Sequence, residues 1–220
     1  MGSDATDLLP RLSRISTTSL VDAAPALRIL PPGLRPLVPG RPFAGVVRTA
    51  RADRDLMSVI GALQVCGAGD VLVVDAGGDE RAVAGELFAT EAQRRGLAGF
   101  VIHGRSRDTA TLATLSIPVW STGVAPNAFP AKAIPQVDIP LDLSGVAVAP
   151  GDLIVGDDDG LVVGTAAELA AALGGAETIE ARERRLQSAM LAGASLFDAM
   201  NFDEHLAELR AGRPGGLALG

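Results

Sequence analysis

The chain has few of the residue types that carry much of common enzyme chemistry. Its 220 residues include no tyrosine, one cysteine (Cys66), one lysine (Lys132) and two histidines. A single cysteine excludes an internal disulfide, and the lack of any CxxC pair excludes the usual zinc-ligand spacing. A catalytic site must therefore use mostly carboxylates, arginines and backbone groups. Cys66, in the apolar segment LQVCGAG, is expected to pack in the core rather than to act as a reactive thiol.

Long apolar runs and an excess of positive charge are also missing. No run approaches the roughly 20 apolar residues that span a bilayer. The N-terminal segment MGSDATDLLPRLSR lacks the basic start and apolar centre of a signal peptide. The formal net charge of -7 argues against broad nucleic-acid binding, which needs a basic face. We therefore expect a soluble, cytoplasmic protein that binds neither membranes nor nucleic acids.

The order of apolar and polar segments predicts one mixed α/β domain over residues 1–220. With 48% hydrophobic residues the chain can bury one sizeable core, and no linker divides it. An Asp-Gly turn in LIVGDDDGLVV predicts a hairpin. The other principal expected elements are helices at 6–13, 83–95 and 176–191 and strands at 45–50, 71–75, 99–104 and 117–121.

The stretch GDVLVVDAGGDERAVAGEL begins like a nucleotide-binding strand, turn and helix. Its glycines do not fit that function, because Gly77 and Gly78 are followed only by Gly85, so GxGxxG is missing. No GxxxxGK[ST] loop occurs, and a methyltransferase loop would have a further closely spaced glycine. What remains is a glycine at a helix start, where free N–H groups suit a carboxylate or enolate. Alternatively, Gly85 is a tolerated glycine within the helix.

A polar cluster, HGRSRDTATL, directly follows the apolar strand GFVI. Arg107 can bind a carboxylate through two parallel hydrogen bonds, and Asp108 is a hard oxygen ligand for Mg²⁺ or Mn²⁺. Alternatively, Asp108 only caps the following helix and Arg107 makes a surface ion pair. These residues by themselves leave both interpretations open.

Taken in order, these segments resemble the family of the 4-hydroxy-4-methyl-2-oxoglutarate aldolases and the regulator of ribonuclease activity A. The resemblance covers about residues 15–195 and is carried by STTSLVDA, GDVLVVDAGGDERAVAGELFATEA, GLAGFVIHGRSRD, IPVW followed by TGVAP, and PGDLIVGDDDGLVV. It implies an α/β fold of the β/β/α swivelling type, with mixed sheets, flanking helices and a helical tail at about 196–220. It also implies homotrimers or hexamers with active sites between subunits.

The resemblance also implies roles for individual residues. Arg107 matches the arginine that binds the pyruvate part of the substrate, and Asp108 matches the aspartate that binds a divalent metal, Mg²⁺ or Mn²⁺. Glu86 matches the acid that orients a water on the metal, and it precedes Arg107 by the family's spacing of 21 residues. The substrate-binding residues implied in this way are Gly85, Glu86, Leu87, Phe88 and Arg107.

The implied function is a class II, pyruvate-forming lyase. It would cleave a 4-hydroxy-2-oxo acid, such as 4-hydroxy-4-methyl-2-oxoglutarate, by a retro-aldol reaction. Because oxaloacetate loses CO₂ through the same pyruvate enolate, decarboxylation is an expected side activity. A lysine Schiff base is the main alternative to a metal, and Lys132, in the Pro-rich loop NAFPAKAIPQ, is the one lysine available.

Two other functions stay open. A non-catalytic regulator would share the fold without needing a metal site, so the Arg107 and Asp108 pair favours the enzyme. A methyltransferase is disfavoured by the glycine spacing. The chain departs from the family pattern at His103, where members often carry Asp or Tyr, and in the loop NAFPAKAIPQ, which leaves the substrate beyond pyruvate undefined. The candidates for an acid donated by a neighbouring subunit are Glu180, Glu183 and Asp203.

Overall fold

The computed structural model describes residues 5–77 and 80–218. Gly78, in the stretch GDVLVVDAGGDERAVAGEL, therefore lies outside the described residues. Contacts divide the chain into two compact units, one ending at Ala176 and one beginning at Glu177. The single domain with a tail from about residue 196 stays a prediction. No helix within the described residues is long and apolar enough to cross a membrane.

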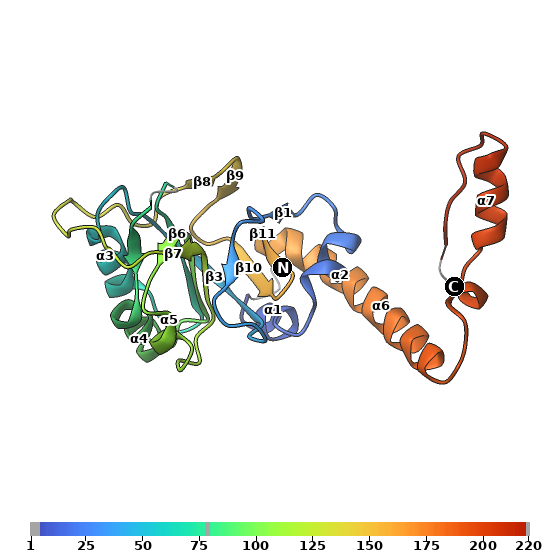
Figure 1. Cartoon of the computed structure of the whole chain (residues 1–220), viewed down its shortest axis with the longest axis horizontal. Coiled ribbons are helices and arrows are strands. Elements are labelled where there is room, and N and C mark those ends of the chain that lie inside the picture. The colour runs from blue at the N-terminus through green and yellow to red at the C-terminus, as the bar shows by residue number, and fades with distance from the viewer. Residues whose placement is uncertain (1–4, 78–79, 219–220) are drawn as a thin grey trace. The chain divides into compact units, whose positions relative to one another are not determined.

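A mixed sheet forms the centre of the first unit (Figure 1). In the described residues its strand order is β1-β11-β10-β3-β4-β6-β7-β2, with β5 paired to β6. Strands β3, β4, β6 and β7 run parallel, whereas β10, β11, β1 and β2 join antiparallel, and β8 and β9 form a separate hairpin. The strands are β1 (Arg28–Ile29), β2 (Arg35–Pro36), β3 (Phe43–Arg51), β4 (Asp70–Asp75), β5 (Ala82–Ala84), β6 (Gly99–Ser106), β7 (Val119–Val124), β8 (Leu141–Leu143), β9 (Val146–Val148), β10 (Leu153–Asp157) and β11 (Gly160–Gly164).

Helices flank this sheet. Helices α3, α4 and α5 lie together beside the parallel strands, whereas α1 and α2 lie beside β10 and β11 (Figure 1). The helices are α1 (Ala5–Leu12), α2 (Thr17–Ala23), α3 (Met57–Val65), α4 (Glu86–Arg94), α5 (Thr109–Leu112), α6 (Ala166–Leu191) and α7 (Phe202–Arg210), with a 3-10 turn at Leu196–Ala199. Ser16 caps α2 by accepting a hydrogen bond from Ser19 N, a role that serine side chains commonly have at helix N-termini.

The parallel strands are buried on both faces, which explains their continuous apolar sequences. Because side chains alternate along a strand, Leu72, Val74 and Ile102 pack on the side of α3 and α4. Val71 and Val73 face the other side, where they pack with residues of β8 and β9. Each such fully buried side chain stabilises the fold by roughly 1.5–3 kcal/mol. Cys66 is buried in the α3 and α4 cluster, so the prediction that it packs in the core is confirmed.

The predicted helix at 83–95 begins too early. Helix α4 starts at Glu86, and Ala82–Ala84 form strand β5, which pairs parallel with β6. All three of these residues are nearly inaccessible to solvent. Such a short, fully buried apolar run has no periodicity that separates a strand from a helix, so the sequence pattern could not place this boundary.

The predicted helix at 176–191 begins too late, because α6 starts at Ala166. The two glycines Gly174 and Gly175 interrupt its sequence and suggest a boundary that the structure does not have. A Cβ added at Gly175 would lie 3.1 Å from the side chain of Ala23 on α2. A glycine there allows close approach of the two helices, so tertiary packing overrides its low helix propensity.

The second unit contains the end of α6, the 3-10 turn and α7. The rings of Phe197 and Phe202 pack edge to face, with centroids 5.6 Å apart. Asn201 ties the following chain to the start of α7, because its side chain donates to Gly216 O and accepts from Ala218 N. A helical C-terminal segment was expected from the sequence, and these contacts account for its order.

Candidate active site

A pocket of about 450 Å³ lies where β5 and β6 end and α4 begins. The predicted site residues lie on two segments of the sequence, 85–88 and 107–108, and the structure brings all of them together here. Its lining includes the six predicted residues Gly85, Glu86, Leu87, Phe88, Arg107 and Asp108.

Parallel pairing of β5 with β6 explains why these segments meet. The carboxyl ends of the two strands lie side by side, and Arg107 N donates to Ala84 O at 3.1 Å. The buried hydroxyl of Ser106 donates to the same carbonyl at 3.3 Å. Ligands of open α/β sheets commonly bind beyond the carboxyl ends of strands, which is where these bonds place Arg107.

Gly85 allows the two segments to approach closely. It is the N-cap of α4 rather than a residue of the helix interior, which decides between the two interpretations of the sequence. A Cβ added there would lie 2.8 Å from Arg107 Cγ and still closer to Asp108 Oδ2. Ordinary contacts of a Cβ begin at 3.4 Å, so only glycine fits this approach.

The first turn of α4 presents backbone N–H groups to the pocket. Glu86 N donates to Asp108 Oδ2 at 3.1 Å, and the first intrahelical bond runs from Ala89 N to Gly85 O. The N–H groups of Leu87 and Phe88 belong to this turn and have no intrahelical acceptor. Together with the positive end of the helix dipole, they make the turn suitable for an anionic oxygen.

Asp108 faces the pocket instead of capping α5. Its backbone is left-handed, with φ 60° and ψ 39°, and its side chain makes no capping hydrogen bond although it occupies the N-cap position. Arg107 Nε lies 3.4 Å from Asp108 Oδ2, so the alternative of an ion pair for Arg107 is realised within the pocket itself. Within the described parts of the chain, Asp108 Oδ1 has no hydrogen-bond partner.

The donor set fits Mg²⁺ or Mn²⁺ better than zinc. Among residues 5–77 and 80–218, no group of three or more His, Cys, Asp or Glu side chains is placed to hold a metal ion. Mg²⁺ keeps several waters and is commonly bound by one or two carboxylates together with oxygens of the substrate. The free Oδ1 of Asp108, on a side chain that is 34% exposed, is such a ligand.

Other residues in question lie elsewhere. Lys132 is exposed in its loop, where its backbone N donates to Asp55 Oδ2, and it does not line the pocket. Glu180, Glu183 and Asp203 belong to the second unit, so their role stays a prediction. Sequence reasoning missed five apolar residues of the lining, Leu56, Ala82, Val83, Ala84 and Ala128. The three consecutive alanine and valine residues form β5, which the sequence did not predict, and tertiary pairing brings Ala128 to that strand.

A mixed sheet flanked by helices, with a pocket at the strand ends, defines an α/β protein of the kind predicted. A sequence model described as RraA-like, Aldolase/RraA, matches residues 17–163. The chain therefore belongs to the RraA-like family, and solved structures of that family confirm the predicted fold.

Similar proteins carry three different names. The chain is 38% identical to a 4-hydroxy-4-methyl-2-oxoglutarate aldolase of Thermus thermophilus, over 67% of this chain and 90% of that protein. RraAS2 of Streptomyces coelicolor, described as an unusual member of the RNase ES inhibitor RraA family, is 30% identical with a TM-score of 0.74, covering 85% and 98%. A Geobacillus kaustophilus protein described as an S-adenosylmethionine:2-dimethylmenaquinone methyltransferase is 33% identical with a TM-score of 0.65, covering 69% and 95%.

Proposed function

We propose that this protein is a divalent-metal-dependent lyase that cleaves a 4-hydroxy-2-oxo acid, such as 4-hydroxy-4-methyl-2-oxoglutarate, and releases pyruvate. The observation that carries the proposal is the meeting of Arg107, Asp108 and the first turn of α4 in one pocket. This set offers a cation, a metal ligand and N–H donors for a small 2-oxo acid. Aldolase relatives such as the Thermus protein add support for a lyase.

The reaction breaks the C3–C4 bond of the substrate and leaves a pyruvate enolate, while C4 becomes a carbonyl carbon. When bound, Mg²⁺ or Mn²⁺ supplies a Lewis acid for the developing negative charge. Arg107 binds the substrate carboxylate in two parallel hydrogen bonds and stays charged throughout. The N–H groups of Leu87 and Phe88 donate to substrate oxygens in a geometry that the helix fixes beforehand.

A proton must leave the 4-hydroxyl as the bond breaks. Glu86 lines the pocket, and its carboxylate accepts this proton through one water. The enolate carbon is then protonated to give pyruvate. The same residues stabilise the enolate that forms when oxaloacetate loses CO₂, so a decarboxylase side activity belongs to the proposal.

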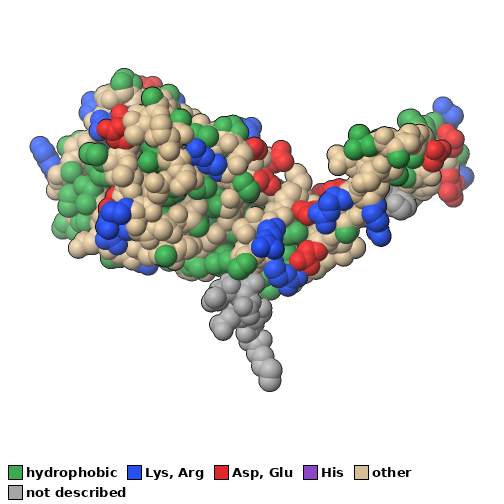
Figure 2. Space-filling view, turned by 90° about the horizontal axis from the view of Figure 1, so that it is seen from below, with side chains coloured by type: hydrophobic (Ala, Val, Ile, Leu, Met, Phe, Trp, Pro, Cys, Tyr) green, Lys and Arg blue, Asp and Glu red, His purple; other side chains and the backbone are tan. Residues whose placement is uncertain are grey.

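The functional unit is proposed to be a homo-oligomer, a trimer or hexamer. Figure 2 shows apolar side chains gathered at several places on one face of the first unit, among acidic and basic ones. Leu87, at the pocket, is 74% exposed, and Ile134 is 88% exposed. Such apolar groups are suited to contact with a second copy, which would also donate the missing acid from Glu180, Glu183 or Asp203.

A regulator is the second candidate, favoured by the likeness to RraAS2. A regulator and a lyase place different requirements on the pocket. A regulator acts by binding and needs neither the metal ligand Asp108 nor Arg107 beside it. The methyltransferase alternative is disfavoured by the spacing of Gly77 and Gly85, which leaves no glycine-rich cofactor loop.

The deciding experiment follows pyruvate release from a panel of 4-hydroxy-2-oxo acids and oxaloacetate. EDTA is expected to abolish release, and Mg²⁺ or Mn²⁺ is expected to restore it. Borohydride with substrate should add no mass to Lys132, because this lysine is exposed in its loop and does not line the pocket. EDTA-resistant release with trapping at Lys132 would overturn the metal mechanism. No release from any substrate would favour the regulator.

A further inference from the structure

A second group of catalytic residue types lies on the opposite side of the sheet from α4. Ser144, in the turn between β8 and β9, places its Oγ 3.2 Å from His103 Nε2. The other ring nitrogen, His103 Nδ1, lies 3.2 Å from Asp75 Oδ1. His103 and Asp75 are register partners on β6 and β4, so the sheet itself fixes this pair. The order is that of a Ser-His-Asp triad.

The positions of the protons follow from the chemistry of the pair. Burial raises the pKa of Asp75, but hydrogen bonds from His103 and from Gly77 N outweigh it and hold that pKa below its usual value. The ionised carboxylate can only accept, so His103 Nδ1 carries the hydrogen between them. In the neutral ring, Nε2 then has the lone pair that accepts the Ser144 hydroxyl. This is the tautomer that a general base requires.

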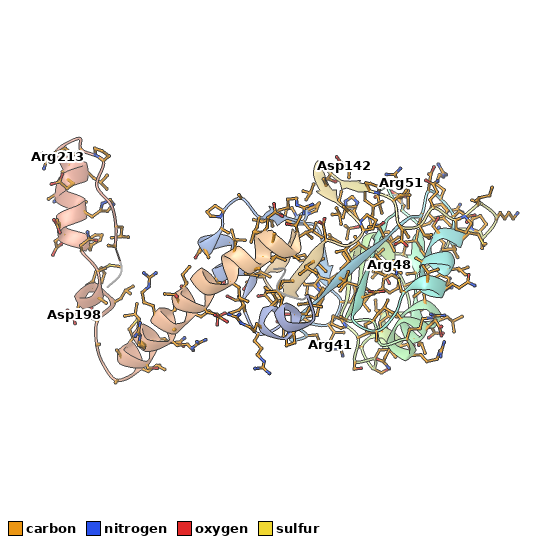
Figure 3. The ribbon with its side chains drawn as sticks, turned by 180° about the vertical axis from the view of Figure 1, so that it is seen from behind. Arg41, Arg48, Arg51, Asp142, Asp198 and Arg213 are labelled. Atoms are coloured by element: carbon orange, nitrogen blue, oxygen red, sulfur yellow. The ribbon has the colours of Figure 1, made fainter. Side chains whose placement is uncertain are left out.

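The imidazole and carboxylate of this group are mostly buried, whereas the hydroxyl that would attack a substrate is accessible. The side chains of His103 and Asp75 are 13% and 14% exposed, whereas Ser144 is exposed to solvent. Arg51 on β3 adds a nearby positive charge, because its Nε lies 4.0 Å from Asp75 Oδ2. Figure 3 labels Arg51, and it also labels Asp142 of β8. The pair is therefore sheltered while the hydroxyl is reachable.

The turn that holds Ser144 places a serine where a two-residue hairpin requires a left-handed residue. Ser144 and Gly145 form a two-residue connection with φ of 53° and 91°. Such turns prefer Asn, Asp or Gly at the first position, and a left-handed serine costs roughly 1–2 kcal/mol. Asp142 Oδ1 accepts from Gly145 N at 2.6 Å and fixes the turn. The serine gains its contact with His103, and strained residues of this kind occur preferentially at functional sites.

We propose that Ser144 is a nucleophile, with His103 as its general base and Asp75 orienting the ring, and that this site hydrolyses small acyl esters. Ser144 Oγ attacks the ester carbonyl carbon while its proton passes to His103 Nε2. The C–O bond to the leaving alcohol then breaks, and the alcohol takes that proton. Water, deprotonated by the same Nε2, releases the acid from the acyl-serine and restores the hydroxyl.

The test uses p-nitrophenyl acetate with the full-length protein. Ser144→Gly removes the hydroxyl and relieves the positive φ, so it should fold at least as well while hydrolysis falls by about 100-fold or more. The rate of hydrolysis by the His103→Gln variant should fall by a similar factor. The matched control is Ser13→Ala, which removes another hydroxyl that donates to a nearby carbonyl, Pro10 O, and should keep the wild-type rate.

A fluorophosphonate probe gives an independent measurement. It is expected to add mass at Ser144 in the wild type and not in the His103→Gln variant. EDTA should leave ester hydrolysis unchanged, which separates this site from the proposed lyase. Hydrolysis that persists in Ser144→Gly, labelling at another residue, or a wild-type rate equal to that of buffer would each overturn the proposal.

Discussion

Replacing Gly85 by alanine tests the geometry of the candidate active site with one methyl group. The new Cβ would meet Arg107 Cγ at 2.8 Å and would lie still closer to Asp108 Oδ2, whereas ordinary contacts begin at 3.4 Å. The backbone of Gly85 is extended, with φ -161° and ψ -157°, so alanine introduces no left-handed strain there. The change therefore acts on the neighbouring side chains and not on the chain path.

The expected magnitude follows from the displacement. Asp108 and Arg107 must move by about 1 Å, and a misplacement of about that size can lower turnover roughly 10²-fold. In free energy this is about 2.7 kcal/mol of lost transition-state stabilisation. The side chains of Arg107 and Asp108 are 41% and 34% exposed, so they can move toward solvent. We expect the fold and its melting temperature to change little.

The assay measures kcat/KM for pyruvate release and the Kd of Mg²⁺ in the same preparation. Gly174→Ala is the matched control, because a Cβ there has no atom within 4 Å. Its activity should equal that of the wild type, and its stability should rise by roughly 0.5–1 kcal/mol because alanine replaces a glycine inside a helix. Wild-type kcat/KM and metal affinity in Gly85→Ala would refute the reasoning.

Three further predictions concern other parts of the molecule. Asp108→Ala should abolish Mg²⁺ binding and turnover while circular dichroism stays unchanged, and Mg²⁺-dependent turnover in this variant would reject the ligand. Burial raises the pKa of Cys66 to about 11, so Ellman's reagent at pH 7 should react only after denaturation. Rapid reaction of the native protein would contradict its core position. Light scattering should give a mass larger than that of a dimer, and a monomer at micromolar concentration would contradict the proposed assembly.

Local sequence pattern was sufficient for the parallel strands and for the residues at their ends. An apolar run followed by a polar cluster indicates a buried strand and its carboxyl end, which singled out Arg107 and Asp108, whereas the roles of the two residues were implied by the family resemblance. Boundaries were harder. The run Ala82–Ala84 is too short to show a period, and the glycines of α6 suggest a break that packing against α2 removes. In the first case the sequence pattern is ambiguous, and in the second case tertiary packing overrides the low helix propensity of glycine.

The group around His103 had no signal in the sequence. His103 precedes Ser144 by 41 residues and follows Asp75 by 28, and no spacing rule links such residues. Their meeting depends on the register of β4 with β6 and on the β8–β9 hairpin, which folds over the apolar side chains of the sheet. Those relations are properties of the tertiary structure, so a Ser-His-Asp group is recognised by geometry and not by sequence order.

Strand β6 carries His103 and leads directly into Arg107, and the geometry of the strand explains why the two residues lie in different places. Side chains alternate between the faces of a sheet, so His103 faces the side of β8 and β9 with Val101. The pairing of β6 with β7 shifts register between Ile102 and Arg105, which redirects the end of the strand. Arg107 follows that irregularity and lines the pocket of α4. A substitution at His103 is therefore expected to leave the pocket undisturbed, because His103 does not line the pocket and its side-chain partners among the described residues are Asp75 and Ser144.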